Sequence, residues 1–481
     1  MATSLDLTDV DWQGDLHWFP YEDLILLLDV NSGAVHLLDA PARDVLEELK
    51  EREERGLLTP ANWLAALPRS TRTWGEETIT AVCREMAAKQ AAGTLFTQDE
   101  AGRNYRPPRP TLQALCLHVA HDCNMRCRYC FADGGPFGGE RGLMDRETGY
   151  AALDLLFQEA GSRPRVEVDF FGGEPLLNFG VVQDLVAYGR QKAAASGKRI
   201  SFTLTTNGLG LTEEVEKYLI AEGLSVILSL DGRREVHDFN RPDAAGRGTY
   251  DRVVEREQHF VARQDHRDYW VRGTYTHQNL DFTRDILHMV ELGFRYLSLE
   301  PVVAAPAAEY AIKEEDLPRL ATEYRRLARA YLEKAAAGQG FSFFHFNIDA
   351  AAGPCLVKRL TGCGAGTSYL AVTPSGELYP CHQLVGRRDY CLGNVRQGLL
   401  RPDLREAFRQ AYVYNQPNCR RCWARFYCSG GCHAANLAAT GDLRQPAPIA
   451  CALQKMRLEA ALYVQVKETK ETKEKGKSLL R

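Results

Sequence analysis

The chain has 481 residues, and 59 Lys and Arg against 63 Asp and Glu give a formal net charge of −4 at pH 7. This length predicts about three domains, and 45% hydrophobic with 25% charged residues is typical of a globular protein. The near-neutral charge argues against wholesale binding to nucleic acid or an anionic membrane. No apolar run approaches the roughly 20 residues of a membrane span, and the N-terminus lacks the features of a signal peptide, so we expect a cytoplasmic protein.

Cysteine is the first informative residue type, with 14 in the chain. In a reducing compartment such a number indicates metal ligation or thiol chemistry rather than disulfides. Three cysteines fall between residues 123 and 130 and nine between residues 355 and 451, with none between 131 and 354. We therefore expect two separate metal-binding regions, and we expect Cys83, Cys116 and Cys391, which fit no spacing pattern, to be small buried side chains.

Residues 1–100 predict a small independent unit. Apolar runs at 23–30 and 34–38 flank Asn31-Ser32-Gly33, which indicates two strands joined by a turn. Helical patterns follow at 42–52 and 76–91, and the proline- and arginine-rich segment 103–110 is typical of a linker. By pattern alone, such a unit fits a dimerisation or cap domain as well as a binding module.

Residues 111–315 predict repeated βα units. Helical patterns at 146–160, 181–196, 212–222 and 280–292 separate strands expected at 115–120, 166–171, 200–205, 224–230, 269–276 and 296–300. This alternation indicates an α/β domain with a parallel sheet, although periodicity does not distinguish an open sheet from a partial barrel.

The last third of the chain predicts a helix at 316–337 followed by the second cysteine region, together spanning 316–465. The cysteine region is rich in glycine and turns, has a short strand at 369–373, and is expected to have little apolar core of its own. Residues 466–481 are a Lys/Glu run that predicts a solvated tail.

Cys123-Asn-Met-Arg-Cys127-Arg-Tyr-Cys130 directly follows the first strand of the βα series. Three thiolates can hold three irons of a four-iron cluster and leave one iron open to a small molecule. A zinc knuckle is the alternative, but zinc sites generally need four ligands, and the nearby His118 and His121 make no obvious fourth. Glycine-bearing polar segments also end the next three strands, at 172–175, 206–208 and 229–232, where barrel enzymes place their active sites.

With Tyr129 in the aromatic place, Cys-x3-Cys-x-aromatic-Cys resembles the hallmark of the radical S-adenosylmethionine (SAM) enzymes, and the resemblance covers residues 115–301. It implies a partial (β/α)6 barrel and a [4Fe–4S] cluster whose open iron binds SAM, the source of a 5′-deoxyadenosyl radical. It also implies a set of SAM-binding residues: Tyr129, Gly172, Gly173, Glu174 and Ser229, with Arg241 on the SAM carboxylate.

The second cysteine region resembles the SPASM domain, which implies two auxiliary [4Fe–4S] clusters and hence three clusters in all. By this resemblance the distal cluster is held by Cys419, Cys422, Cys428 and Cys451. The nearer cluster is held by Cys363, Cys381 and Cys432, and its fourth ligand is either Cys355 or a substrate thiolate. A pair of zinc sites is the alternative, and seven cysteines in the spacing of the SPASM domain argue against it.

The whole chain is similar to the thioether-forming maturases of six-cysteine SCIFF peptides, in the sactipeptide/ranthipeptide group, through residues 118–123, 130–134, 137–141 and 363–367. The N-terminal unit resembles a PqqD-like winged-helix recognition element, which binds a leader peptide as an added strand. The implied partners are a ribosomal precursor peptide and an electron donor such as ferredoxin or flavodoxin, with no nucleic acid and no membrane.

Two alternatives stay open. A sulfatase-maturing (formylglycine-forming) oxidase shares the barrel and the SPASM domain, but that family carries an aspartate after Tyr-Pro-Cys, where this chain has His382. Histidine can also accept a proton near neutral pH. A non-catalytic peptide-binding or electron-transfer protein is the second alternative, and a cysteine loop that leaves one iron open argues against it.

Overall fold

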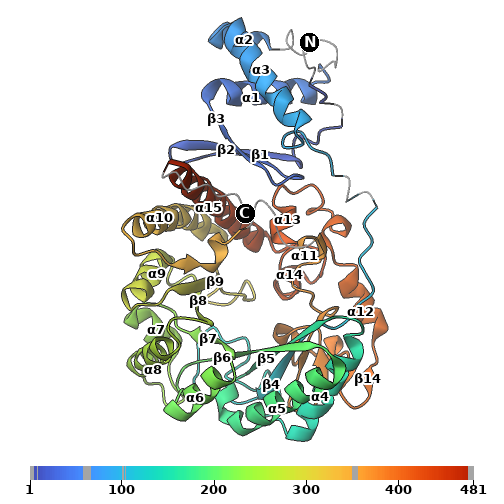
Figure 1. Ribbon diagram of the computed structural model, residues 1–481, viewed down its shortest axis with the longest axis vertical. Helices are drawn as coiled ribbons and strands as arrows, with labels where there is room; N and C mark the ends of the chain where they lie inside the picture. Colours follow the sequence, from blue (N-terminus) through green and yellow to red (C-terminus); the bar gives the residue numbers. More distant parts are fainter. Residues whose placement is uncertain are drawn as a thin grey trace.

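The structure is a computed structural model that describes residues 5–7, 9–57, 67–99, 102, 104–348 and 356–474. An N-terminal unit stands at one end of the molecule, and an open ring of βα units lies at the other (Figure 1). Helices α10 (Leu317–Ala336) and α15 (Pro448–Glu474) lie side by side between these two parts. None of the helices in the described ranges has both the length and the apolar character of a membrane span.

The N-terminal unit is a three-stranded antiparallel sheet with three helices. The strands follow the order β1 (Leu16–Tyr21), β2 (Leu24–Asp29), β3 (Val35–Leu38), and the helices are α1 (Ala40–Glu54), α2 (Pro68–Trp74) and α3 (Glu76–Ala91). The predicted hairpin forms as β2 and β3, whereas β1 and α2 were not predicted.

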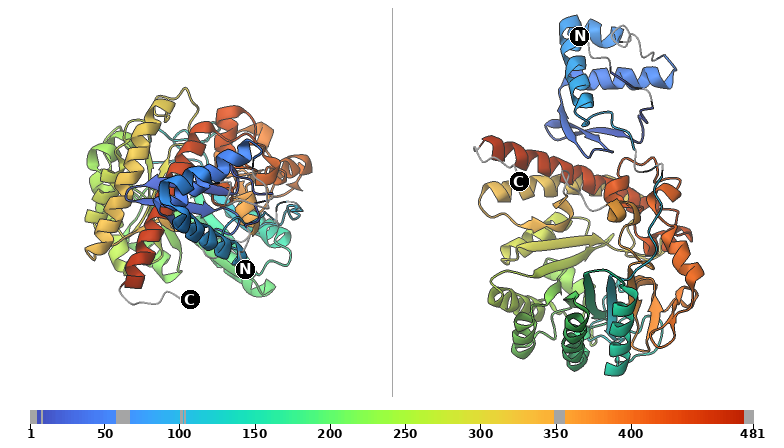
Figure 2. Two further views of the ribbon diagram at one scale, coloured as in Figure 1. Left: turned by 90° about the horizontal axis from the view of Figure 1, so that it is seen from above. Right: turned by 45° about the vertical axis from the view of Figure 1, so that its right-hand side comes forward.

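Strands β1 and β2 of this small sheet contribute side chains to two different cores, one on each face. Leu16 and Leu27 pack with α1 and α3 in a core that belongs to the N-terminal unit, while Tyr21, Leu26 and Leu28 are part of the main core of the molecule. Tyr21 contacts Tyr463 of α15, with ring centroids 4.8 Å apart. One face of the sheet is therefore completed by the body, onto which the N-terminal unit docks (Figure 2).

Six parallel strands form the βα domain, in the order of the chain. They are β4 (Ala114–Ala120), β5 (Arg165–Gly172), β6 (Arg199–Thr206), β7 (Ser225–Ser229), β8 (Tyr269–Tyr275) and β9 (Tyr296–Pro301). The helices between them are α4 (Arg146–Glu159), α5 (Phe179–Ser196), α6 (Glu213–Ala221), α7 (Arg234–Asn240), α8 (Tyr250–Arg263) and α9 (Phe282–Glu291). All six strands were predicted to within one residue at each end, but α7 and α8 were not predicted.

The sheet does not stop at β4, because β11 (Tyr369–Val372) of the cysteine-rich region pairs with it in parallel. β10 (Ser342–Phe343) extends the other edge, so the full order is β10-β9-β8-β7-β6-β5-β4-β11-β12-β13-β14. The remaining strands are β12 (Glu377–Tyr379), β13 (Gly393–Asn394) and β14 (Gly398–Leu399). Ala371 and Tyr379 share a small core with Cys116 and Phe137, so the cysteine-rich region borrows its apolar core from the βα domain.

The other helices of the C-terminal part are short except for α15. They are α11 (Leu356–Thr361), α12 (Pro402–Arg409), α13 (Arg425–Cys428) and α14 (His433–Thr440), with 3-10 turns η1 (Pro175–Asn178), η2 (Glu314–Asp316), η3 (Phe344–Phe346), η4 (His382–Leu384), η5 (Arg388–Tyr390) and η6 (Val413–Asn415) elsewhere. The predicted tail at 466–481 is helical as far as residue 474, as the end of α15, and its last seven residues lie outside the described ranges.

Candidate functional site

The loop that carries Cys123, Cys127 and Cys130 is held against the end of β5. The amide of Gly173 donates to the Ala120 carbonyl at 2.8 Å, and the amide of Glu174 donates to the Asp122 carbonyl at 2.9 Å. A Cβ atom added at Gly172 or Gly173 would lie 2.2 Å from a carbonyl oxygen of this loop, and Gly172 has a φ of 131°. Both positions therefore need glycine, because only glycine lets the two backbones approach this closely.

The three thiols of this loop lie close enough to influence one another. Burial raises the pKa of Cys127 to about 12, and the Cys130 and Cys123 thiols add to that effect. The Met125 amide donates to the Cys123 sulfur at 3.4 Å, and the Asn207 side-chain amide donates to it at 3.6 Å. Hydrogen bonds to cysteine sulfurs are one of the ways in which proteins set the potential of an iron–sulfur cluster.

Glu174 braces the ends of two neighbouring strands. Its buried carboxylate accepts hydrogen bonds from the Thr206 hydroxyl at 2.8 Å and from the amides of Asn207 and Leu176 at 2.8 and 3.0 Å. Burial outweighs these bonds and raises the pKa of Glu174 to about 7. Because the protein already supplies three donors to this carboxylate, Glu174 positions β5 and β6 beside the cysteine loop.

Asp231, within the polar segment 229–232, connects two of the expected SAM-binding residues. Its carboxylate accepts the Tyr129 hydroxyl at 2.7 and 2.9 Å, pairs with Arg241 at 3.0 Å, and accepts the Thr274 amide at 2.9 Å. Burial lowers the pKa of Arg241, but Asp231, Tyr129 and Cys127 together hold it above its ordinary value. The position of Asp231 in Ser-Leu-Asp-Gly, at the end of β7, was the sequence signal for its role.

Arg241 and Ser229 complete the set expected to bind SAM. The Nε atom of Arg241 is buried and has no hydrogen-bond partner among the described residues, so the guanidinium keeps a free donor for an anionic group. Ser229 is half-buried at the end of β7. A buried cation with a free donor, beside the cysteine loop, fits a carboxylate-bearing ligand such as SAM.

The other described cysteines that are expected to bind clusters lie in two groups. Burial raises the pKa of Cys381 to about 12, with further contributions from Cys432 and Cys363. Burial also raises the pKa of Cys419 to about 12, with contributions from the rest of its group, which comprises Cys428, Cys451 and Cys422. Cys355 lies outside the described residues. Of the unassigned cysteines, Cys83 and Cys116 are buried and Cys391 is half-buried.

Metal binding would change the protonation of these cysteines. Within the described ranges, no three His, Cys, Asp or Glu side chains converge on a position for one metal ion. A bound metal stabilises thiolates, which burial alone disfavours in all three groups.

Aromatic and histidine side chains occupy the space between the first cysteine loop and Cys381. The His382 ring lies 5.6 Å from the Phe131 ring and 5.2 Å from the Phe171 ring, measured between centroids. Its Nδ1 lies 3.0 Å from the Tyr369 hydroxyl. Burial, with a smaller contribution from Arg272, lowers the pKa of His382 to about 4.

The N-terminal unit contacts the loop that carries the Cys419 group. Trp423 stacks on His17 of β1, with ring centroids 3.7 Å apart. Arg425 is 2% exposed, pairs with Asp15 at 2.9 Å and donates to the Asn31 side-chain oxygen. Side chains between the ligands expected for the distal cluster therefore form the docking surface for the N-terminal unit.

Comparison with known proteins gives two domain matches. Residues 117–259 match the radical SAM superfamily, and residues 363–423 match the SPASM iron–sulfur cluster-binding domain. The serine-type anaerobic sulfatase-maturating enzyme of Klebsiella aerogenes is 26% identical over 362 residues, covering 70% of this chain and 83% of that protein. The mycofactocin maturase MftC of Mycolicibacterium smegmatis is 25% identical over 347 residues, covering 69% and 82%.

Two solved structures share the fold. Native anSMEcpe with bound AdoMet and Cp18Cys peptide has a TM-score of 0.62 at 21% identity, covering 75% of this chain and 100% of that chain. Streptococcus suis SuiB bound to the precursor peptide SuiA has a TM-score of 0.51 at 16% identity, covering 91% and 98%.

The chain thus has the radical SAM α/β fold with a SPASM domain, the two domains that its sequence matches. More particularly, it is similar to anaerobic sulfatase-maturating enzymes and to peptide maturases, and its radical SAM and SPASM matches imply SAM and more than one [4Fe–4S] cluster as cofactors.

Proposed function

We propose that this enzyme installs cysteine thioether cross-links in a ribosomally made, cysteine-rich precursor peptide. When bound, SAM supplies the 5′-deoxyadenosyl radical that removes a hydrogen atom from an acceptor residue. Each link then costs the peptide one hydrogen atom, which the 5′-deoxyadenosyl radical takes, one proton, and one electron, which the auxiliary clusters would accept, as the cysteine sulfur bonds to the acceptor carbon. An external donor such as ferredoxin or flavodoxin is part of this proposal.

The N-terminal unit supports action on a precursor peptide over sulfatase maturation, and product analysis tests the kind of bond formed. anSMEcpe is matched over its whole length but spans 75% of this chain, whereas SuiB spans 91%. SuiB thus matches more of this chain than anSMEcpe does, including a part beyond the barrel and the SPASM domain. Formylglycine formation stays the second candidate, because sulfatase-maturating enzymes are similar over 70% of the chain.

The residues proposed for each role follow from the site. Cys123, Cys127 and Cys130 hold the SAM-binding cluster, Arg241 and the backbone at Gly172 and Gly173 contact SAM, and Asp231 and Glu174 position them. The Cys363 and Cys419 groups hold two auxiliary clusters, which makes three clusters in total.

The leader peptide is proposed to bind at β3. This strand is an edge of the N-terminal sheet among the described strands, and its Leu37 side chain is 42% exposed. An edge strand offers unpaired backbone groups for strand addition. The other edge, β1, lies against α15.

Product analysis tests the proposal. The cluster-loaded enzyme is incubated with SAM, a reductant and a cysteine-containing precursor peptide, and the product is analysed by mass spectrometry before and after thiol alkylation. A thioether lowers the mass by two hydrogens per link and removes one alkylatable cysteine. An aldehyde in place of a cysteine would instead establish formylglycine formation. Replacing Cys123, Cys127 and Cys130 together with alanine is the control and should abolish SAM cleavage.

A further inference from the structure

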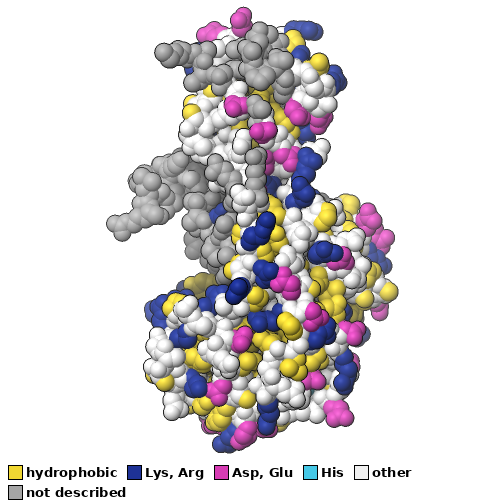
Figure 3. Space-filling view, turned by 90° about the vertical axis from the view of Figure 1, so that its right-hand side faces the viewer, with side chains coloured by type: hydrophobic (Ala, Val, Ile, Leu, Met, Phe, Trp, Pro, Cys, Tyr) yellow, Lys and Arg dark blue, Asp and Glu magenta, His cyan; other side chains and the backbone are white. Residues whose placement is uncertain are grey.

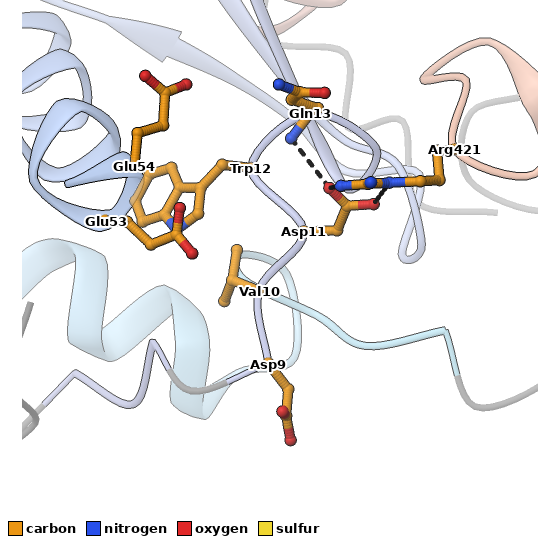
Figure 4. A pocket seen from close by; sticks show the side chains of 8 residues that line it. All are labelled: Asp9, Val10, Asp11, Trp12, Gln13, Glu53, Glu54 and Arg421. Atoms are coloured by element: carbon orange, nitrogen blue, oxygen red, sulfur yellow. Dashed lines mark hydrogen bonds and ion pairs between the residues drawn. The ribbon is translucent and has the colours of Figure 1, made fainter. Parts of the chain in front are cut away.

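A pocket of about 340 Å³ lies where the N-terminal unit meets the loop of the Cys419 group. Its lining carries four carboxylates, Asp9, Asp11, Glu53 and Glu54, and one cation, Arg421. Asp11 pairs with Arg421 at 2.7 Å, whereas Glu53 and Glu54 lie on the other side of the pocket, beside Trp12 (Figure 4). The other three carboxylates have no ion-pair partner among the described residues. Acidic and basic side chains both lie on the face of the molecule near the junction of the N-terminal unit with the body (Figure 3). Such a pocket attracts a positive charge.

Trp12 supplies an independent sign of a ligand. The residue is 4% exposed, it lines this pocket, and its indole Nε1 is buried with no hydrogen-bond partner in the described part of the chain. Figure 4 places this nitrogen at the edge of the ring on the side of Glu53. Buried tryptophan N–H groups usually have an acceptor, and leaving one without it is unfavourable. A ligand that fits the pocket therefore carries both a cation and a hydrogen-bond acceptor.

A peptide segment with a basic side chain meets both requirements. A lysine or arginine side chain can reach the carboxylates while a backbone carbonyl of the same segment accepts from the indole. A divalent cation could satisfy the carboxylates but could not accept a hydrogen bond from Trp12. A second pocket of about 380 Å³ adjoins the first through Trp12 and Gln13 and is lined by Leu16, His17, Trp18 and Lys50. It leaves room for the residues that flank the basic one.

We infer that this acidic pocket binds a lysine or arginine of the precursor peptide, in addition to the leader site proposed at β3. The inference rests on the proposed action on a peptide. The pocket gives the enzyme a second point of recognition, specific for charge. Because Asp11 pairs with Arg421, the bound residue also lies next to the loop of the Cys419 group.

Equilibrium dialysis of the full-length, cluster-loaded protein tests this site. The probes are two blocked pentapeptides, acetyl-Ala-Ala-Lys-Ala-Ala-amide and the same peptide with norleucine in place of lysine. We expect the lysine peptide to bind at least tenfold more tightly at low salt, and we expect added salt to weaken its binding. Equal binding of the two peptides would overturn the inference.

Two variants and a matched control localise the binding. Glu53→Gln combined with Glu54→Gln should weaken binding of the lysine peptide about tenfold, and Trp12→Phe should weaken it about threefold. Glu76→Gln combined with Glu77→Gln, an exposed acidic pair on α3, should leave it unchanged. Unchanged binding in the Glu53/Glu54 variant would refute the site even if Trp12→Phe failed to fold. Thioether formation is measured separately, so a failure of the proposed function and a failure of this pocket are distinguishable.

Discussion

Replacement of Arg425 by methionine tests whether the N-terminal unit stabilises the loop of the Cys419 group. Arg425 is 2% exposed, and its guanidinium pairs with Asp15 and donates to Asn31 and to the Gly14 carbonyl. Removing one member of a buried ion pair costs about 3–5 kcal/mol. At about 1.4 kcal/mol per factor of ten, the lower of these costs raises the fraction of molecules with an undocked N-terminal unit by up to about 150-fold.

Hydrogen exchange of the cluster-loaded protein measures this effect, because exchange through local opening follows the open population. We expect faster exchange in the peptide that spans residues 419–432 and loss of part of the iron during incubation with a chelator. Arg420→Met is the matched control, since Arg420 is exposed in the same loop. A change of less than threefold in Arg425→Met would refute the idea that docking protects the loop.

Three further changes test other parts of the site. Asp231→Asn leaves Arg241 buried without its carboxylate partner, so SAM binding measured by dialysis should weaken at least tenfold, whereas the exposed control Asp265→Asn should bind normally. Burial raises the pKa of Glu257 from 4.5 to about 8, so the folded state holds a proton that the unfolded state loses. The free energy of unfolding should therefore fall as pH rises through this range, by on the order of 2–3 kcal/mol from pH 6 to pH 8. Denaturant titrations at several pH values measure this fall, and Glu257→Gln should remove it. An unchanged pH dependence in the variant would refute the role of Glu257. Cys355→Ala should leave the spectrum of the nearer cluster and the thioether product intact if a substrate thiolate is the fourth ligand, and should disturb both if Cys355 is that ligand.

The strands of the βα domain could be predicted from the sequence because the patterns that indicate them are local. Each strand is a short apolar, β-branched run closed by a glycine-bearing turn, and the cysteine loop directly follows the first of them. Helix α8 was missed although it contributes Glu257, whose carboxyl lies beneath the turn at Gly208. Charged residues such as Arg252 and Arg256 obscured the apolar stripe of that helix.

Contacts between residues far apart in the sequence could not be predicted from local patterns. Nothing in the sequence around Tyr369 indicates that β11 pairs with β4, some 250 residues earlier in the chain. The contact between the N-terminal sheet and the body does have a local signal, because the run Leu24-Ile-Leu-Leu-Leu28 does not alternate with polar residues. A strand of this kind is buried on both faces, so the run already implied that the N-terminal sheet packs against something besides its own helices.

The pairing of β11 with β4 also determines where Cys381 lies relative to the first cysteine loop. Tyr369 pairs with Ala114 at the start of β4, and β12 returns antiparallel, so Cys381 lies near that end of the sheet. The first cysteine loop follows the other end of β4, but the two groups approach one another through the residues next to them. The His382 ring lies 5.6 Å from the Phe131 ring. Burial raises the pKa of the Cys116 thiol of β4, and Cys381 is close enough to add to this effect. Under the proposed function, a substrate cysteine on the His382 side and an acceptor carbon on the Phe131 side would therefore lie close together.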